Sequence, residues 1–290
     1  MAITIVVVAV NRDREVRTRT FNSGGKILYT FSIIIPAYNE AQYLPATIAA
    51  IRQAEQALGE PVEIIVGDNV STDATASVAK SLGAKVVPVD IRCISVVRNR
   101  AAEQATGKYL VFVDADDHMS RNMLVEIKRV MDAGKHIGGG VARTRYDRRS
   151  WGIEFTHGLV QTGLSFTGIS MFLFYTTPEA FWTSGAFNAE LLCTEDYDFA
   201  RRLQSLGKKR GLKYKNLRTA HLVKSSRKFN EFGDWGVFTR PVLAISAMFA
   251  SKKAAHTIWY KPRRQGSAEM VQLPQASVAK ETEGERTSAA

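Results

Sequence analysis

Two hydrophobic periods alternate along the first half of the chain. Short apolar runs rich in β-branched residues predict buried strands at Phe31–Pro36, Val62–Val66, Lys85–Val89 and Tyr109–Val113. The segments between them have helical spacing and predict helices at Asn39–Leu58, from a cap at Ser71–Asp73 to about Leu82, at Ser95–Ala105 and at Met119–Ala133. Strands that alternate with helices predict an α/β fold with a mostly parallel, Rossmann-like central sheet flanked by helices.

The second half of the pattern is less regular. It predicts a strand region from Gly138 to Tyr146, a strand at Phe172–Tyr175, a helix from Asp196 to Leu206 that Gly207 ends, a short strand at Ala220–Val223 and a helix at Pro241–Tyr260. Residues 30–235 therefore form one predicted α/β domain, with a first half at about 30–135 and a second half at about 136–235.

The two ends of the chain differ from this domain. Residues 1–29 are expected to be an N-terminal extension, in which Ile3–Val10 is either an added edge strand or leader sequence from a start codon placed too far upstream. Residues 265–290 are poor in large apolar side chains and predict a disordered tail.

Positive charge is concentrated near the end of the predicted domain. The chain has a net charge of +11, and residues 201–264 alone carry +15. Such a block suits an anionic partner, such as phosphate groups, an anionic membrane or nucleic acid, and it is also typical of a solvated basic face. Within it, residues 236–264 join the apolar run Val242–Ala250 to Trp259, Tyr260 and several basic residues. This segment is either membrane-interfacial or a helix packed on the sheet.

The composition is that of a globular protein from a reducing compartment. Apolar residues make up 45% of the chain and charged residues 23%, which excludes a wholly disordered chain. Only two cysteines occur, so a disulfide framework is also excluded. No apolar run approaches the roughly twenty residues that span a membrane. We therefore expect a cytoplasmic protein, with peripheral contact to the cytoplasmic face of the membrane as an alternative.

Polar residues follow three of the predicted strands, where open parallel sheets bind ligands. The sharpest group is Asp114-Ala115-Asp116-Asp117. Asp114 and Asp116 are two residues apart on extended backbone, so their side chains project to one face. Neighbouring carboxylates repel each other unless a cation neutralises them, and Mg²⁺ or Mn²⁺ accepts such ligands. The alternative is an acidic loop that caps the next helix.

A second acidic pair begins the predicted helix near residue 196. Glu195 and Asp196 point about 100° apart on a helix, so at most one of them faces a given substrate atom. The pair is either catalytic or a favourable interaction with the helix dipole.

Five motifs occur in an order that is typical of one enzyme family. They are Pro36-x-Tyr38-Asn39-Glu40, Asp68-Asn69-x-Ser71-x-Asp73, Arg98-Asn99 with Gly107, the DXD pattern Asp114-x-Asp116-Asp117, and Glu195-Asp196 with Arg201-Arg202-Leu203. Over residues 31–230 the chain resembles the family 2 glycosyltransferases, which have the GT-A nucleotide-diphospho-sugar transferase fold. The resemblance implies transfer of a sugar from a nucleotide-sugar donor to an acceptor hydroxyl, with inversion at the anomeric carbon and with Mn²⁺ or Mg²⁺.

The resemblance also implies roles for single residues. By this resemblance, Pro36, Tyr38 and Glu40 would line the nucleotide pocket, and Asp68 would bind the base, which is usually uracil. Arg98 would lie near the nucleotide, Asp114 would lie near the ribose, and Asp116 would bind the metal. Asp196 would be the general base. These roles fit the chemistry, because a cation stabilises charge on the departing diphosphate and a carboxylate can take the acceptor's proton.

Three further assignments concern the second half. His221 is either a third metal ligand, as in some GT-A enzymes, or an ordinary polar residue. Arg227 and Lys228 are expected to contact the diphosphate from a flexible C-terminal loop. Trp182 and Phe187 flank a stretch that resembles the family's acceptor-side loop, and they either form a platform for a sugar ring or pack in the core.

One departure from the family narrows the expected reaction. Processive members carry a Gln-x-x-Arg-Trp motif, whereas the comparable stretch Lys224–Phe229 lacks Gln and Trp. We therefore expect addition of a single sugar to a sugar or lipid-linked acceptor, in cell-surface polysaccharide or glycolipid synthesis. A nucleotidyltransferase would need an early Gly-rich phosphate loop. A non-catalytic protein that binds nucleic acid or other anions through residues 201–264 would leave the acidic motifs unexplained, so nucleic acid is not an expected partner.

Overall fold

The computed structural model describes residues 4–10, 16–22, 28–170, 172–191 and 194–235. Three predictions therefore lie outside the described residues: the helix at Pro241–Tyr260, the segment 236–264 as membrane-interfacial or packed on the sheet, and the disordered tail 265–290. The chain divides into two compact units, Met1–Tyr260 and Lys261–Ala290, and the described residues all belong to the first. Among them, no helix is both long enough and apolar enough to cross a membrane.

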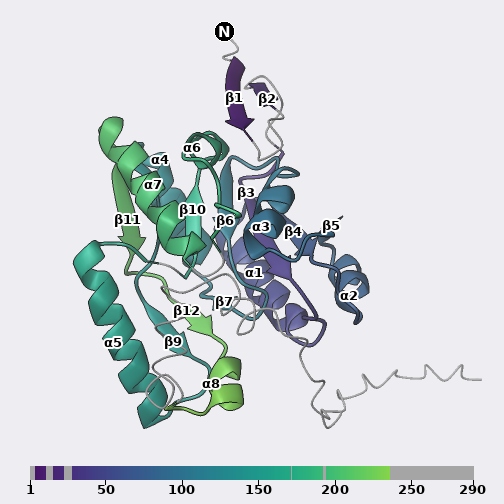
Figure 1. The fold of residues 1–290 in the computed structure, drawn as a ribbon, viewed down its shortest axis with the longest axis vertical. Coiled ribbons are helices and arrows are strands. Elements are labelled where there is room, and N and C mark those ends of the chain that lie inside the picture. The colour runs from purple at the N-terminus through teal and green to yellow at the C-terminus, as the bar shows by residue number, and fades with distance from the viewer. Residues whose placement is uncertain (1–3, 11–15, 23–27, 171, 192–193, 236–290) are drawn as a thin grey trace, which may run out of the picture. The chain divides into compact units, whose positions relative to one another are not determined.

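A seven-stranded sheet organises the first unit (Figure 1). Its order is β11-β8-β10-β6-β3-β4-β5. The strands are β3 (Phe31–Ala37), β4 (Val62–Asp68), β5 (Lys85–Pro88), β6 (Tyr109–Phe112), β8 (His136–Val141), β10 (Phe174–Thr176) and β11 (Lys213–Leu217). Neighbouring strands pair in parallel except at β10, which is antiparallel to β6 and β8. The prediction of a mostly parallel α/β sheet is confirmed.

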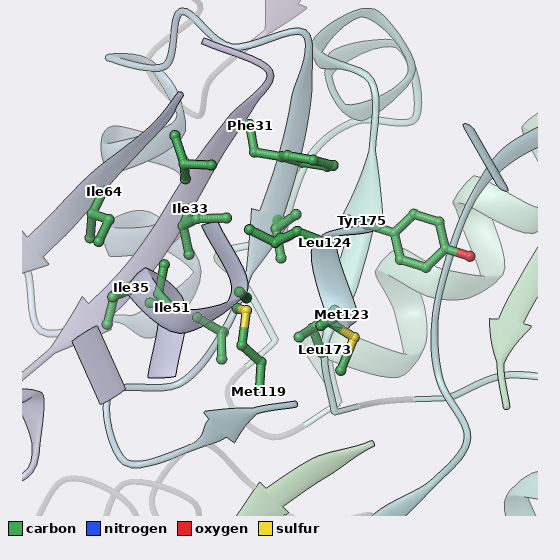
Figure 2. Packing of buried hydrophobic residues seen from close by; sticks show 14 of the residues in the cluster. Phe31, Ile33, Ile35, Ile51, Ile64, Met119, Met123, Leu124, Leu173 and Tyr175 are labelled. Carbon is green, nitrogen blue, oxygen red and sulfur yellow. The ribbon is translucent and has the colours of Figure 1, made fainter. Parts of the chain in front are cut away.

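Helices connect these strands and bury the sheet. They are α1 (Leu44–Leu58), α2 (Thr75–Ser81), α3 (Ile94–Ala102), α4 (Met123–Asp132), α5 (Trp151–Thr167), α6 (Pro178–Thr183), α7 (Glu195–Lys209) and α8 (Arg227–Phe232). Alternate residues of β3 enter two separate clusters, because successive side chains of a strand point to opposite faces. Ile33 packs with Ile51 of α1 and Leu124 of α4 (Figure 2), whereas Ile34 packs with Phe199 of α7.

A small sheet lies beyond the main one and carries part of the later chain. It has the order β7-β12-β9, with β7 at His118–Met119, β9 at Thr144–Tyr146 and β12 at Leu222–Lys224. The helix expected to begin at Met119 therefore begins at Met123, because Met119 pairs with Leu222 of β12.

The N-terminal extension forms a hairpin of its own. β1 (Thr4–Val10) pairs antiparallel with β2 (Val16–Asn22) in a separate two-stranded sheet. An added edge strand was one of the two predictions for Ile3–Val10. The described part of this segment, β1, does not extend the seven-stranded sheet. Val10 and Val16 are partners in this hairpin, so the strand is paired with a neighbouring segment of the chain.

Candidate active site

The polar strand ends meet at one edge of the sheet. β3, β4 and β6 are parallel neighbours, so the residues that follow them emerge on the same side. Tyr38 and Glu40 follow β3, Asp68 ends β4, and Asp114 follows β6. The start of α7 joins this group, because Asp196 shares a cation with Asp114.

That cation is Arg98 on α3, which is only 5% exposed. Its Nη2 lies 2.9 Å from Asp114 Oδ1, its Nη1 lies 2.7 Å from Asp196 Oδ1, and the same Nη1 is 3.7 Å from Glu195 Oε1. Burial lowers the pKa of Arg98, but the charges of the three carboxylates outweigh it and hold the pKa above its ordinary value. One guanidinium thus fixes the end of β6 against the first turn of α7.

A glycine lets α3 approach closely enough for this contact. Gly67 lies in β4 beneath α3, and a Cβ atom there would be 2.6 Å from Cγ1 of Val97. Because Val97 directly precedes Arg98, any side chain at position 67 would push α3, the helix that carries Arg98, away from the sheet.

The two acidic residues of α7 face different surroundings. Glu195 is 6% exposed, and burial followed by the charge of Asp196 raises its pKa to about 7. The Asp196 side chain is 27% exposed. Burial also raises the pKa of Asp196, although the charge of Arg98 opposes this. Asp196 is therefore the more accessible carboxylate and Glu195 the more buried one.

Two more cations hold the acidic strand end of β6. Lys224 Nζ lies 2.7 Å from Oδ2 of Asp117 and 3.8 Å from Oδ2 of Asp114. Arg227 Nη2 lies 2.9 Å from Oδ2 of Asp116, and the same guanidinium bonds Glu40 at 2.7 and 3.2 Å. Burial and the charges of Asp114 and Asp116 raise the pKa of Asp117, against the effect of Lys224.

Lys224 was not predicted from the sequence as a site residue, and the prediction of a flexible loop around Arg227 is wrong. Lys224 alternates with Val223 on β12 and shares a face with Leu222, which is fully buried, so the strand period could have placed it inward. Arg227 begins helix α8 and does not lie on a loop. Its contacts with both Glu40 and Asp116 join the end of β3 to the end of β6.

The donor-side loops are tied together by side-chain hydrogen bonds. Ser71 Oγ accepts from the backbone N–H of Asn39 at 3.0 Å, and Asn39 Oδ1 accepts from the Thr72 N–H at 2.8 Å. Asn39 has a φ of 54°, a left-handed conformation that asparagine tolerates. Asp68 Oδ1 accepts from the Ser71 N–H at 3.3 Å. The loops after β3 and β4 therefore support each other.

Two sequence-predicted pocket residues differ in their positions. The ring of Tyr38 lies under the guanidinium of Arg92, whose Cζ is 4.1 Å from the ring centroid. Pro36 is buried within β3, opposite Gly67 of β4. Tyr38 is thus placed at the strand end, whereas Pro36 shapes the strand that carries it.

The acidic cluster suits a divalent ion that is only partly held by protein. In the described ranges, no group of three or more His, Cys, Asp or Glu side chains is arranged as a metal cage. Mg²⁺-type ions keep several waters and use one or two carboxylates together with substrate phosphates. Asp116, with its side chain 18% exposed, fits that use.

His221 is placed elsewhere. It lines a hollow with Arg143, Thr144 and Arg145, and burial and the charges of Arg145 and Arg143 lower its pKa. Two neighbouring cations disfavour a further cation at this position. The structure does not bring His221 to Asp116.

The aromatic residues near the expected acceptor loop belong mainly to the core. Phe187 is 2% exposed and packs 4.5 Å from Phe199 and 5.1 Å from Phe112, centroid to centroid. Trp182 packs on Phe181 at 4.8 Å. Phe187 therefore packs in the interior and is not a platform for a sugar ring.

A mostly parallel sheet whose acidic strand ends face a helix of the second half agrees with the GT-A nucleotide-diphospho-sugar transferase fold. Comparison with family profiles matches residues 32–192 to Glycosyl transferase family 2. The chain belongs to this family.

Curated relatives match part of the chain. The 4,4'-diaponeurosporenoate glycosyltransferase of Staphylococcus aureus (strain N315) is 37% identical over 122 residues, which are 40% of this chain and 31% of that protein. The poly(ribitol-phosphate) beta-N-acetylglucosaminyltransferase TarS of S. aureus (strain Mu50) is 29% identical over 108 residues, which are 35% of this chain and 19% of that protein. The chain thus spans less than a third of the length of these two relatives.

Solved structures share the fold over more of the chain. The mannosyltransferase PcManGT of Pyrobaculum calidifontis, in complex with GDP-Man and Mn²⁺, matches with a TM-score of 0.51 and 16% identity, over 79% of this chain and 78% of that one. S. aureus TarS 1-349 matches with a TM-score of 0.51 and 17% identity, over 79% and 69%. At this level of identity the likeness establishes the fold.

Proposed function

We propose that this protein is an inverting, metal-dependent glycosyltransferase that moves one sugar from a UDP-sugar to an acceptor hydroxyl. The observation that carries the proposal is the bridge by Arg98 between Asp114 of β6 and Asp196 of α7, at 2.9 and 2.7 Å. It sets a carboxylate of the second half beside the donor-side strand ends. A base and a donor must be neighbours for a hydroxyl to attack the sugar.

The donor's nucleotide would bind over the loops that follow β3 and β4. In this proposal Tyr38 and Asp68 contact the nucleoside and Asp114 contacts the ribose. Glu40, which is only 5% exposed, contributes to the pocket by holding Arg227. Support comes from the hydrogen bonds that fix these loops and from the likeness to solved structures with nucleotides, including TarS 1-349 in complex with UDP, with a TM-score of 0.50. Arg98 lies beneath this surface and acts by positioning Asp114.

The diphosphate would meet the cations of β12 and α8. Arg227 presents a guanidinium between Glu40 and Asp116, and guanidinium groups bind phosphate oxygens in a bidentate manner. Asp116 would hold Mn²⁺ or Mg²⁺. The ion, when bound, stabilises the negative charge that develops on the departing diphosphate. Lys224 holds Asp117 and Asp114 in place beside it.

Asp196 would accept the proton of the acceptor hydroxyl. Burial raises its pKa and makes it a stronger base, while Arg98 favours its ionised form. Because Asp196 lies on α7 and Asp116 follows β6, the base and the ion can act on opposite sides of the sugar. That arrangement leads to inversion.

The proposed acceptor is a sugar or a lipid-linked sugar of a cell-surface polysaccharide or glycolipid. The family membership and the names of curated relatives, which include the minor teichoic acid biosynthesis protein GgaA of Bacillus subtilis, support this pathway. The absence of Gln and Trp from Lys224–Phe229 supports addition of a single sugar.

Thermal shift with UDP, GDP and their sugar conjugates, with and without Mn²⁺, tests the donor and the ion. We expect one nucleotide to raise the melting temperature only when Mn²⁺ is present. Asp116→Ala should lose this shift, and Glu154→Ala, which removes an exposed acid on α5, should keep it. The absence of a shift with every nucleotide would refute the proposed donor class.

Asp196→Asn tests the base separately. General base catalysis contributes about 10²- to 10⁴-fold, so this variant should lose transferase activity by that factor. Its Mn²⁺-dependent thermal shift with the nucleotide should remain. If Asp196→Asn transfers sugar at the wild-type rate, Asp196 is not the base.

A further inference from the structure

The small sheet carries a second cluster of positive charge. A hollow of about 210 Å³ is lined by Arg143, Thr144, Arg145 and His221, and we call it the β9–β12 hollow. Two arginines and a histidine contribute to this lining, and none of its described residues carries a carboxylate. Such a lining is suited to an anion.

The arginines of the hollow differ from most others in the described chain. Salt bridges to Asp or Glu hold Arg52, Arg98, Arg100, Arg129, Arg148, Arg149, Arg202, Arg210 and Arg227. Arg143 and Arg145 are exposed, and among the described residues neither pairs with a carboxylate. Their charges act on His221, whose pKa is lowered by burial and then by Arg145 and Arg143. The hollow therefore has a positive potential that no described acidic group compensates.

The scaffold of the hollow is fixed. Thr144 Oγ1 accepts a hydrogen bond from Gln161 Nε2 of α5 at 2.7 Å and lies 2.6 Å from Nε2 of His157. The backbone N–H of His221 donates to Ser120 Oγ at 3.1 Å. β9 and β12 pair in register, with Leu222 opposite Thr144 and Val223 opposite Arg145. The paired strands thus fix Arg145 within β9 and fix Arg143 and His221 next to the first residues of β9 and β12.

The hollow is separate from the proposed donor site. Lys224, three residues after His221, reaches Asp117, and three residues of strand span about 10 Å. Side chains alternate across a strand, so Val223 and its partner Arg145, which lines the hollow, project to the face of the small sheet opposite Lys224. An anion bound at His221 is therefore not the diphosphate that Arg227 would meet.

We propose that the β9–β12 hollow binds a phosphate group, distinct from the diphosphate of the donor. Two guanidinium groups present planar N–H donors that match phosphate oxygens, and the imidazole N–H adds a third direction. The phosphate is either that of a soluble phosphoester or that of a lipid headgroup, because both present the same oxygens. This site does not depend on the glycosyltransferase proposal.

The test uses Arg143→Ala/Arg145→Ala in the full chain. Both residues are exposed, and neither forms a salt bridge with a described residue, so the variant should fold. The matched control is Lys208→Ala/Lys209→Ala, which removes two exposed charges at the end of α7. Calorimetry at constant ionic strength would measure binding of inorganic phosphate and glycerol phosphate. We expect the affinity to fall at least tenfold in the arginine variant and less than twofold in the control.

Two further measurements distinguish the sources and the sites. Sedimentation would compare vesicles of phosphatidylglycerol and phosphatidylcholine with vesicles of phosphatidylcholine alone. If the wild type binds the phosphatidylglycerol vesicles and the arginine variant does not, the phosphate is that of a lipid headgroup. If only the free phosphoester binds, the ligand is soluble. Binding of UDP with Mn²⁺ should be unchanged in the arginine variant. Equal losses in both variants, or competition between UDP and phosphate, would overturn the proposal.

Discussion

Glu195 offers a test of the site's electrostatics that needs no substrate. It is 6% exposed, and its Oε2 accepts no hydrogen bond from the part of the chain that the structure describes. Burial and the charge of Asp196 raise its pKa to about 7 from an ordinary 4.5, although Arg98 opposes the shift. We predict that Glu195→Gln makes the fold more stable at alkaline pH and leaves it nearly unchanged at acidic pH.

The sign and size follow from proton linkage. Between pH 4.5 and 7 the folded protein holds the Glu195 proton while the unfolded chain has lost it. Stability from this group is therefore fully present below pH 4.5 and is lost as pH rises through 7. At 1.36 kcal/mol for each pH unit between the two pKa values, the loss is about 3 kcal/mol. Glutamine cannot ionise, so the variant avoids this loss.

Urea denaturation at pH 5 and pH 8 would measure the effect. Glu195→Gln should match the wild type within about 1 kcal/mol at pH 5 and exceed it by about 3 kcal/mol at pH 8. Glu154→Gln, an exposed acid on α5, should show no pH-dependent difference. If Glu195→Gln is destabilising by the same amount at both pH values, Glu195 is ionised throughout and the argument from burial is wrong.

Two further substitutions test the packing and the ion pairs. Gly139→Ala should unfold the protein or prevent soluble expression, because a Cβ there would lie 1.7 Å from the carbonyl oxygen of Lys215. Gly158→Ala is the control, because an added Cβ at position 158 would meet no described atom within 4 Å. Circular dichroism should show that this control variant folds normally. Lys224→Met should destabilise the fold by about 3–5 kcal/mol in urea, since it leaves the buried Asp117 without its cation. Adding Asp117→Asn should restore most of that loss, and a double variant no better than Lys224→Met would contradict the pairing.

The first half of the fold could be predicted because its pattern is simple. Buried parallel strands are nearly continuous apolar runs, and Phe31–Pro36 and Val62–Val66 lie within β3 and β4 as expected. The boundaries failed where tertiary contacts decide them. The helix expected from Asn39 begins at Leu44, because the side chain of Asn39 instead bonds Thr72 in the loop after β4.

Glycines account for two errors in the second half. α7 was expected to end at Gly207 but continues to Lys209. A Cβ at position 207 would lie 2.8 Å from Ile137, so this glycine permits close packing and does not end the helix. α5 was not predicted at all, because glycines at 152, 158 and 163 weaken its helical signal. It contacts β9 through His157 and Gln161, and the hydrophobic pattern of the sequence does not predict such contacts.

The sequence predicted where the acidic residues would gather but not what would hold them. The ion pairs of the site join three cations, Arg98, Lys224 and Arg227, to six carboxylates, Glu40, Asp114, Asp116, Asp117, Glu195 and Asp196. These residues come from separate parts of the chain, and no spacing rule connects position 98 to position 196.

Carboxylates thus outnumber cations within this network, and the excess must be balanced. Protons supply part of the balance, since burial raises the pKa values of Asp117, Glu195 and Asp196. A divalent ion would supply the rest, and it becomes necessary once a donor adds the negative charge of its diphosphate. The three protein cations alone do not balance the site, so its charge is suited to a substrate that arrives with a metal ion.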